Sequence, residues 1–176
     1  MKLIKLFGAF FLLLLLLFSC QDKQVLNAPV VEQSLESIAR DIIKDAKNCA
    51  LITTDNLGLS YARPMDPFLP DDEFTIWMAT NPKSSKVKQI AYNPRATLYY
   101  FDAKNGAYVT LQGLIELVDN PMEKEKHWKD EWTGFYKNKT TDYLLLKFKP
   151  SHGFLISEKH KILGDSITWA APKLDF

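Results

Sequence analysis

Two groups of polar residues in this chain could bind an anion. Ser84, Ser85 and Lys86 follow an apolar run and stand where a short helix is expected to begin. Hydroxyl groups, an ammonium group and the free N–H groups of a first helical turn all favour a phosphate. Arg63 stands in a nearly charge-free strand-like segment, where a guanidinium suits a planar acceptor such as phosphate or carboxylate. The alternatives are a solvated helix start and an edge-strand arginine that points to solvent.

Short strands joined by tight turns, with few helices, surround these groups. Apolar residues at helical spacing predict a helix over 34–47, and a second, over 82–92, has Asn81 as N-cap and Pro82 as first residue. A third predicted helix, over 121–136, is rich in charged and aromatic residues. Strands are predicted over 49–55, 59–65, 73–80, 96–102, 108–118, 143–150, 153–157 and 165–170. This pattern predicts a mainly β fold, an antiparallel barrel or sandwich, and excludes a Rossmann-type fold.

The N-terminus has the pattern of an export signal. Lys2 and Lys5 flank the start of an apolar run over 6–18, which is shorter than the ~20 residues that span a membrane. "LFSC", ending at Cys20, resembles the lipobox of bacterial lipoproteins, in which the cysteine is acylated. We therefore expect a signal peptide over 1–19, a tether over 20–31 and one domain over 32–176. The expected location is the bacterial cell envelope, lipid-anchored to a membrane on its periplasmic or outer face; simple secretion or a retained anchor are the alternatives.

Composition narrows the function classes. Lys and Arg number 22 and Asp and Glu 21, so we expect no nucleic-acid partner, which would favour a basic excess. If Cys20 carries lipid, Cys49 has no disulfide partner and is expected to be buried. The three histidines are scattered, and no metal site is predicted. No Ser-His-Asp, Cys-His or paired-carboxylate pattern indicates catalysis by side chains alone.

Three stretches together resemble a known family. They are "ATNPKSSKVKQIAYNPRATLYYF" at 79–101, "ARPM" at 62–65, and "KHWKDEWTGFY" at 126–136 with the strands that follow it. In order and spacing they resemble the pyridoxamine 5′-phosphate oxidase-like FMN-binding split barrels, nearest to the general stress protein 26 branch. The resemblance covers roughly 38–157. It implies an antiparallel FMN-binding split barrel that forms a homodimer, with each FMN at the interface between subunits.

The resemblance also implies roles for individual residues. Arg63 and Lys86 would pair with the FMN phosphate, to which Ser85 would donate. Ser84 is also placed at the cofactor. Pro64 and Met65 would lie along the flavin ring, and Ala79 and Thr80 would contact it from the next strand. Tyr108 stands where the oxidases have glutamine, and Trp169 would replace an aromatic residue of the family that is missing here.

Departures from the family pattern bear on the reaction. This chain lacks the terminal Arg-Leu-His-x-Arg segment of the oxidases, and it has no arginine after Arg95. A true pyridoxamine phosphate oxidase is therefore not expected. The family's arginine beside the phosphate lysine is Ser85 here. We expect a membrane-tethered flavoprotein in which the flavin carries the redox chemistry on an unknown small molecule. The alternatives are a non-catalytic flavin- or haem-binding module for storage or sensing, and a structural lipoprotein without a ligand.

Overall fold

The computed structural model describes residues 33–176. The predicted signal peptide, the tether and Cys20 lie outside the described residues. Within them, no helix is both long and apolar enough to cross a membrane.

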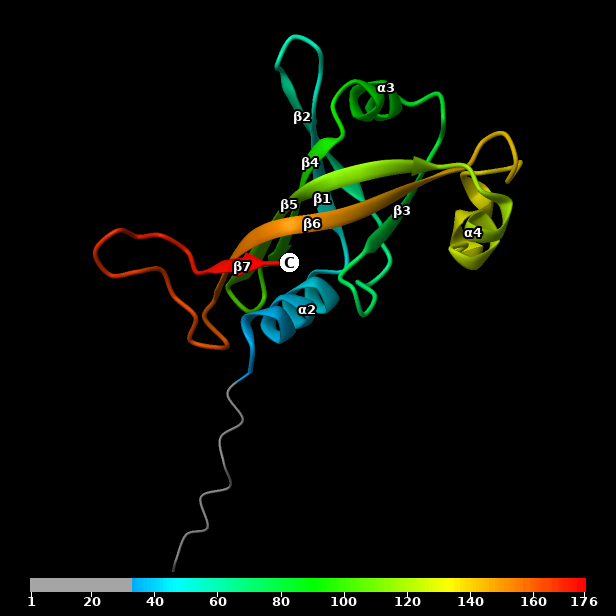
Figure 1. Ribbon diagram of the computed structural model, residues 1–176. Helices are drawn as coiled ribbons and strands as arrows, with labels where there is room; N and C mark the ends of the chain where they lie inside the picture. The colour runs from blue at the N-terminus through cyan, green and yellow to red at the C-terminus, as the bar shows by residue number, and fades with distance from the viewer. Residues whose placement is uncertain (1–32) are drawn as a thin grey trace, which may run out of the picture. The chain divides into compact units, whose positions relative to one another are not determined.

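The first described helix, α2 (Leu35–Ala46), confirms the helix predicted over 34–47. Ser34 caps it, since its hydroxyl accepts a hydrogen bond from the N–H of Ser37 at 3.1 Å. Its apolar face buries Ile38 and Ile42 against the sheet. Figure 1 shows α2 (blue) below the strands. The chain therefore enters the described domain through a helix that closes one end of the core.

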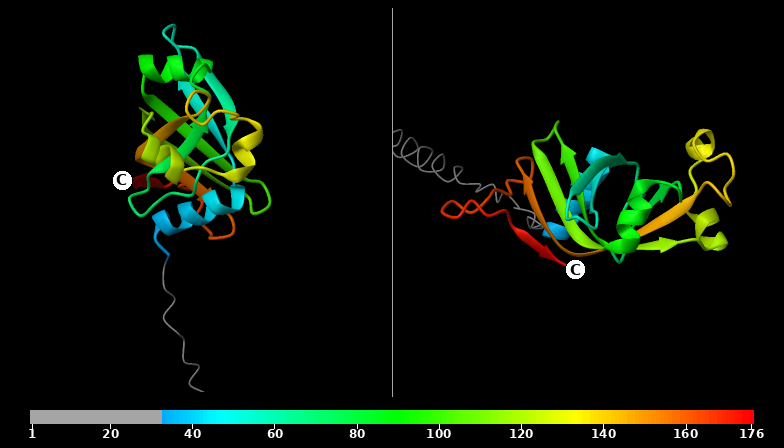
Figure 2. Two further views of the ribbon diagram at one scale, coloured as in Figure 1. Left: turned by 90° about the vertical axis from the view of Figure 1, so that its right-hand side faces the viewer. Right: turned by 90° about the horizontal axis from the view of Figure 1, so that it is seen from above.

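The strands form one antiparallel sheet, which confirms the predicted mainly β fold. Its strands are β1 (Cys49–Thr54), β2 (Ser60–Met65), β3 (Ile76–Thr80), β4 (Arg95–Asp102), β5 (Ala107–Val118), β6 (Leu144–Ser157) and β7 (Lys173–Asp175). The order is β2-β1-β4-β5-β6-β3, and β7 pairs with β6. The two end strands, β2 and β3, do not pair with each other. The curled sheet therefore has an opening between them (Figures 1 and 2).

Alternating side chains divide the sheet into a buried inner face and an outer face. Leu51, Leu98, Leu111 and Leu155 point inward and are fully buried. A second apolar cluster packs around Trp77, Trp132, Tyr143 and Leu145, beside the first. Complete burial of a leucine side chain contributes about 1.5–3 kcal/mol relative to exposure. The inner face is therefore the main source of stability for the strands that position the site.

Strand β6 replaces two predicted strands, those over 143–150 and 153–157. It runs through Pro150 opposite β5, and the register shifts between Gln112 and Gly113. At Gly113 the strands approach so closely that an added Cβ would lie 2.0 Å from the carbonyl oxygen of Lys149. The glycine thus permits a bulge that lets one long strand pass the proline.

Two other predictions of secondary structure are wrong. The helix predicted over 121–136 is a short helix, α4 (Pro121–Lys126), followed by a 3-10 turn, η2 (Asp130–Gly134). Asp66 accepts hydrogen bonds from Lys129 and Trp132, which fixes this segment against β2 instead of continuing the helix. The predicted strand over 165–170 is a turn, because the Asp165 carboxylate accepts from the N–H groups that follow it.

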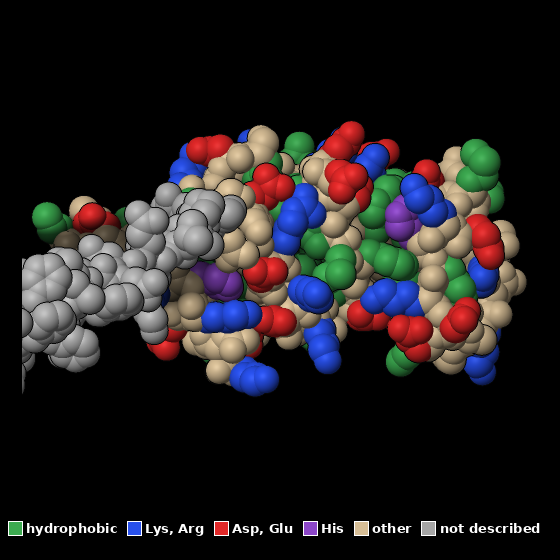
Figure 3. Space-filling view, turned by 90° about the horizontal axis from the view of Figure 1, so that it is seen from below, with side chains coloured by type: hydrophobic (Ala, Val, Ile, Leu, Met, Phe, Trp, Pro, Cys, Tyr) green, Lys and Arg blue, Asp and Glu red, His purple; other side chains and the backbone are tan. Residues whose placement is uncertain are grey.

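Charged side chains of both signs are mixed on the molecule's lower face. Figure 3 shows Lys and Arg interspersed with Asp and Glu there, with apolar side chains between them. The ion pair of Arg40 with Glu36 on α2, at 3.0 Å, is partly exposed. Such pairs contribute little to stability. This face therefore carries no extended field of one sign.

Candidate functional site

The opening between β2 and β3 contains a hollow of about 530 Å³, which we call the split pocket. One part of its lining consists of residues that the sequence predicted, namely Pro64, Met65, Ala79, Thr80, Ser84 and Lys86. The other residues that line it are Asp66, Asn81, Glu131, Trp132, Phe135 and Tyr136. Its volume lies within the range of small-molecule sites, about 300–1,000 Å³. Six of the ten predicted cofactor residues thus meet in one pocket.

Helix α3 (Ser85–Tyr92) begins later than predicted. Ser84, and not Asn81, is its N-cap. The Asn81 side chain accepts from the N–H of Lys83 at 2.9 Å, and its carbonyl accepts from Ser84, so residues 81–84 form a turn. The Ser84 hydroxyl makes no capping hydrogen bond. It lies instead 3.0 Å from Thr80 Oγ1, and Ser84 lines the split pocket.

Two hydroxyls and an ammonium group form a short chain at this end of the pocket. Lys86 Nζ donates to Thr80 Oγ1 at 3.1 Å, and Thr80 Oγ1 lies 3.0 Å from Ser84 Oγ. Thr80 is buried, whereas Ser84 and Lys86 are half-buried. These groups come from the end of β3 and the start of α3, and they provide several donors to a single acceptor.

Arg63 lies on β2 and reaches α3. One guanidinium nitrogen donates to Thr53 Oγ1 at 2.6 Å and another to Gln89 Oε1 at 2.8 Å. Both partners are buried, and Thr53 also donates to Gln89 at 2.6 Å. Because both partners are neutral, they hold Arg63 in place without cancelling its charge.

The charges of Arg63 and Lys86 have no carboxylate partner within residues 33–176. Burial lowers the pKa of the Lys86 ammonium, and the nearby positive charge of Arg63 lowers it further. Burial also lowers the pKa of the Arg63 guanidinium. Two partly desolvated cations that repel each other would both be stabilised by an anion between them. The local electrostatics therefore favour an anionic ligand.

The edges of β2 and β3 supply backbone groups beside these cations. In the described sheet, β2 pairs with β1 alone and β3 with β6 alone. Their other edges border the opening, where Pro64, Met65, Ala79 and Thr80 line the split pocket. Unpaired strand edges offer N–H and C=O groups to a ligand. The pocket can thus bind a molecule that carries both an anionic group and a polar, flat part.

Four predicted residues do not line the split pocket. Ser85 is the exposed first residue of α3. Arg63 lines a neighbouring hollow, and its chain neighbour Pro64 lines both that hollow and the split pocket. Tyr108 lies on β5, with its ring 5.9 Å from that of Tyr99. Trp169 is 86% exposed in the segment between β6 and β7, which projects from the sheet in Figures 1 and 2. Within one subunit, Tyr108 and Trp169 are therefore outside the pocket.

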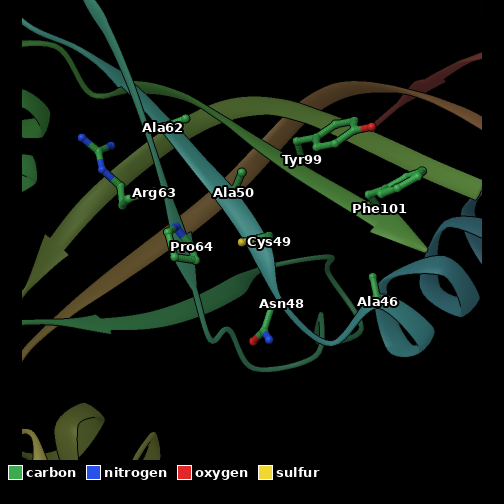
Figure 4. Close-up of a pocket in the computed structure, with 9 residues that line it drawn as sticks. All are labelled: Ala46, Asn48, Cys49, Ala50, Ala62, Arg63, Pro64, Tyr99 and Phe101. Atoms are coloured by element: carbon green, nitrogen blue, oxygen red, sulfur yellow. The ribbon is translucent and has the colours of Figure 1, made fainter. Parts of the chain in front are cut away.

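A second hollow, of about 440 Å³, lies beside the first. Figure 4 shows Arg63 and Pro64 on one side of it and the rings of Tyr99 and Phe101 on the other, with Ala50 and Ala62 between them. Pro64 borders both hollows. The second hollow opens on the outer face of the sheet, next to Arg63.

Sequence reasoning missed two sets of site residues. Thr53 and Gln89, which hold Arg63, carry no signal in a single sequence, because their role depends on the packing of α3 against β1. Trp132, Phe135 and Tyr136 belong to the noted aromatic stretch "KHWKDEWTGFY". Because a continuous helix was predicted there, the sequence did not indicate that the three side chains form one wall of the split pocket.

The histidines are engaged elsewhere. His127 stacks on Trp77, with ring centroids 4.1 Å apart. His152 Nε2 lies 2.7 Å from Gln112 Oε1, and His160 Nδ1 lies 2.9 Å from Ser157 Oγ. None of the three lines the split pocket. Within residues 33–176, no cluster of His, Cys, Asp or Glu is arranged to hold a metal ion.

The family is established by comparison with known sequences. Residues 34–173 match the model of the family described as "pyridoxamine 5′-phosphate oxidase like". The chain therefore belongs to the pyridoxamine 5′-phosphate oxidase-like family, which confirms the resemblance found in its motifs. No curated protein matches the chain.

Solved structures support the same fold. A protein related to general stress protein 26 from Clostridium acetobutylicum, of the pyridoxinephosphate oxidase family, is 20% identical with a TM-score of 0.63, covering 79% of this chain and 91% of that one. A pyridoxamine 5′-phosphate oxidase-related, FMN-binding protein from Nostoc punctiforme is 13% identical (TM-score 0.58, 81% and 96% covered). A heme-binding protein from Mycobacterium smegmatis is 18% identical (TM-score 0.60, 72% and 55% covered). The fold is therefore the antiparallel split barrel, with relatives that bind FMN or haem.

Proposed function

We propose that this chain is an FMN-binding flavoprotein whose cofactor phosphate binds between Arg63 and Lys86. The observation that carries the proposal is the pair of partly buried cations without a carboxylate partner in the described domain. A phosphate ester carries close to two negative charges at neutral pH and three strong acceptor oxygens. It would relieve the repulsion between the two cations and accept hydrogen bonds from Ser84 and Thr80.

The residues of the split pocket fit the rest of FMN. The edges of β2 and β3 offer backbone donors and acceptors for the heteroatoms of a flat ring, and Pro64, Met65 and Ala79 offer apolar surface. When bound, FMN supplies the capacity for electron or hydride transfer. The protein's residues bind and orient it, and oxidoreductase activity on a small molecule is part of the proposal.

Haem is the second candidate, because one structural neighbour is a heme-binding protein. The lining of the split pocket favours FMN. It contains no histidine, and its ammonium and two hydroxyls are grouped at one end, as a phosphate ester requires. A non-catalytic flavin carrier is distinguished from an enzyme by whether a nicotinamide donor reduces the bound flavin.

We also propose a homodimer formed through the outer face of the sheet. Across β2, β1, β4 and β5, this face presents a row of residues that is uncharged except for Arg95 at the start of β4; the uncharged residues are Ser60, Ala62, Pro64, Ala50, Ile52, Thr54, Thr97, Tyr99, Phe101, Tyr108, Thr110 and Gln112. Tyr99 and Phe101 remain exposed on it. Depletion of charge and enrichment of aromatics are typical of interface cores. Neither Tyr108 nor Trp169 lines the split pocket of its own subunit, so any contact of theirs with FMN requires such a dimer.

We propose further that the dimer is tethered to a membrane by acylation of Cys20, as its sequence motif indicates. Two acyl chains are enough for stable anchoring without a spanning helix. The test is fractionation of cells that express the full chain. Wild type should be recovered with membranes, and Cys20→Ser should be released or remain unprocessed. Identical processing and fractionation of the two would contradict the tether.

The cofactor is tested with the purified full chain in detergent. Its absorption spectrum should show flavin bands, or gain them on titration with FMN. Riboflavin, which lacks the phosphate, should bind at least about tenfold more weakly, since at least one charged hydrogen bond is lost. Saturable binding of hemin, with no binding of FMN, would overturn the assignment in favour of haem. Flavin that NADH and NADPH leave oxidised would favour a carrier over an enzyme.

A further inference from the structure

Three aromatic side chains form a wall of the split pocket that the cofactor phosphate does not require. Trp132, Phe135 and Tyr136, which we call the aromatic wall, line the pocket together with Glu131. Phe135 is 80% exposed, whereas Trp132 is buried. An exposed aromatic ring that lines a pocket offers apolar contact area to a ligand in that pocket.

The aromatic wall is held in place by Asp66, the residue that follows β2. Its carboxylate accepts from Lys129 Nζ at 2.6 Å and from Trp132 Nε1 at 2.9 Å. Lys129 also donates to the carbonyl of Pro67 at 3.0 Å. These bonds join the η2 segment to the strand that carries Arg63 and Pro64. Trp132 is therefore positioned relative to the edge of β2, and the N–H groups of Phe135 and Tyr136 donate to the carbonyl of Trp132 at 2.9 and 3.0 Å.

Charge on this side of the pocket differs from that at the phosphate end. Asp66 is neutralised by Lys129, whereas Glu131 is exposed and has no basic partner within 33–176. No lysine, arginine or histidine other than Lys86 lines the pocket. A ligand beside the aromatic wall therefore meets the exposed ring of Phe135, the half-buried ring of Tyr136 and the free carboxylate of Glu131. These groups disfavour an anion and favour a neutral or cationic ring.

We propose that the aromatic wall binds the flat aromatic ring of a second ligand, neutral or cationic, which is the substrate class of the flavoprotein. The proposal rests on the proposed function, because it assigns the phosphate end and the edges of β2 and β3 to FMN. Asp66 acts as a positioning residue, since it holds Trp132 and, through Lys129, the whole η2 segment. An aliphatic substrate gains less from this wall, because it lacks the stacking interaction.

The test is calorimetric titration of the FMN-loaded full chain with benzamide, its saturated analogue cyclohexanecarboxamide, and benzoate. Benzamide should bind about three- to tenfold more tightly than cyclohexanecarboxamide, which is about 0.5–1.5 kcal/mol of ring stacking. Benzoate should bind more weakly than benzamide. Equal affinities for benzamide and its saturated analogue, or tighter binding of benzoate, would overturn the proposal.

Variants test whether the aromatic wall causes the preference for benzamide over cyclohexanecarboxamide. Phe135→Ala should abolish the preference for benzamide, whereas Met122→Ala, at an equally exposed residue (79%) outside the pocket, should retain it. Asp66→Asn should reduce the preference while FMN still binds. If FMN binds and every variant keeps the preference, the wall is not the site and the proposed function stands. If FMN does not bind to the wild type, the proposed function and this inference both fail.

Discussion

Arg63 and Lys86 define the site at the scale of single residues. Each is held by neutral partners, Arg63 by Thr53 and Gln89, and Lys86 by Thr80. Neutral hydrogen bonds orient these charges but leave them uncompensated, so the pKa of each is lowered by burial. This arrangement lowers the stability of the free protein, and binding of an anion restores that stability.

Cys49 should be chemically inert in the folded protein. It is 4% exposed, and burial raises the pKa of its thiol from 9.0 to about 12. Because the thiolate is the reactive form, iodoacetamide at pH 8 should label Cys49 only after unfolding in guanidinium. Mass spectrometry of peptides from native and unfolded protein measures this, with Cys49→Ser as the control for other labelling. Rapid labelling of Cys49 in the native protein would contradict its burial.

The raised pKa of Cys49 also makes the stability of the protein depend on pH in the alkaline range. The folded pKa of Cys49 lies above the unfolded value, so the folded state retains the proton longer. The contribution of Cys49 to stability is fully present below pH 9 and is lost as the pH rises toward 12. Cys49→Ser should therefore lessen the fall in unfolding free energy over that range.

At the scale of elements, Gly113 permits the bulge that allows β5 and β6 to pair along their length. A Cβ at this position would lie 2.0 Å from the carbonyl oxygen of Lys149 and 2.7 Å from Cα of Pro150, both backbone atoms. Gly113→Ala should therefore destabilise the protein by about 1–3 kcal/mol, as overpacking does. Denaturant unfolding measures the change. Gly134→Ala, where nothing lies within 4 Å of the added Cβ, is the matched control. Equal stability of the two variants would show that the strands can separate at Gly113 without cost.

Much of the fold was predictable from local pattern, and the exceptions have tertiary causes. Helical spacing predicted α2, and alternating residues predicted most strands, because burial of one face dictates both periods. The helix over 121–136 was overpredicted because Asp66, distant in sequence, holds Lys129 and Trp132. The start of α3 was misplaced because the Asn81 side chain forms a local turn, an alternative that an N-cap residue also allows.

The site was predictable only in part. Lys86 was found from its place at a predicted helix start, whereas Thr80 and Pro64 were found through the family motifs; all three line the split pocket. The partners of Arg63 and the arrangement of the aromatic wall depend on packing between segments far apart in sequence, which a single sequence does not reveal. Trp169 and Tyr108 lie outside the split pocket of their own subunit. Their predicted contact with the cofactor stays a prediction that requires a partner subunit.

At the scale of the whole molecule, the outer face predicts self-association, because it is rich in aromatic residues and carries few charges. A glutamate at Phe101, which is 57% exposed on this face, would be desolvated without a partner in a dimer. Sedimentation at micromolar concentration should therefore give a dimer for the wild type and a monomer for Phe101→Glu. Leu57→Glu, at an exposed turn between β1 and β2, should remain dimeric. A monomeric wild type, or monomers from both variants, would contradict an interface on the outer face.

The most direct test of the account compares Lys86 with Lys88 in calorimetric FMN titrations of the full chain. Lys86 is half-buried in the split pocket, and Lys88 is exposed on the same helix. Loss of one charged hydrogen bond of about 1.5–3 kcal/mol predicts FMN affinity about tenfold to hundredfold weaker for Lys86→Ala, with Lys88→Ala close to wild type. Riboflavin affinity should differ little among the three proteins. Equal FMN affinities for Lys86→Ala and Lys88→Ala would contradict the account, because the segment from Ser84 to Lys86 would then be an ordinary solvated helix start.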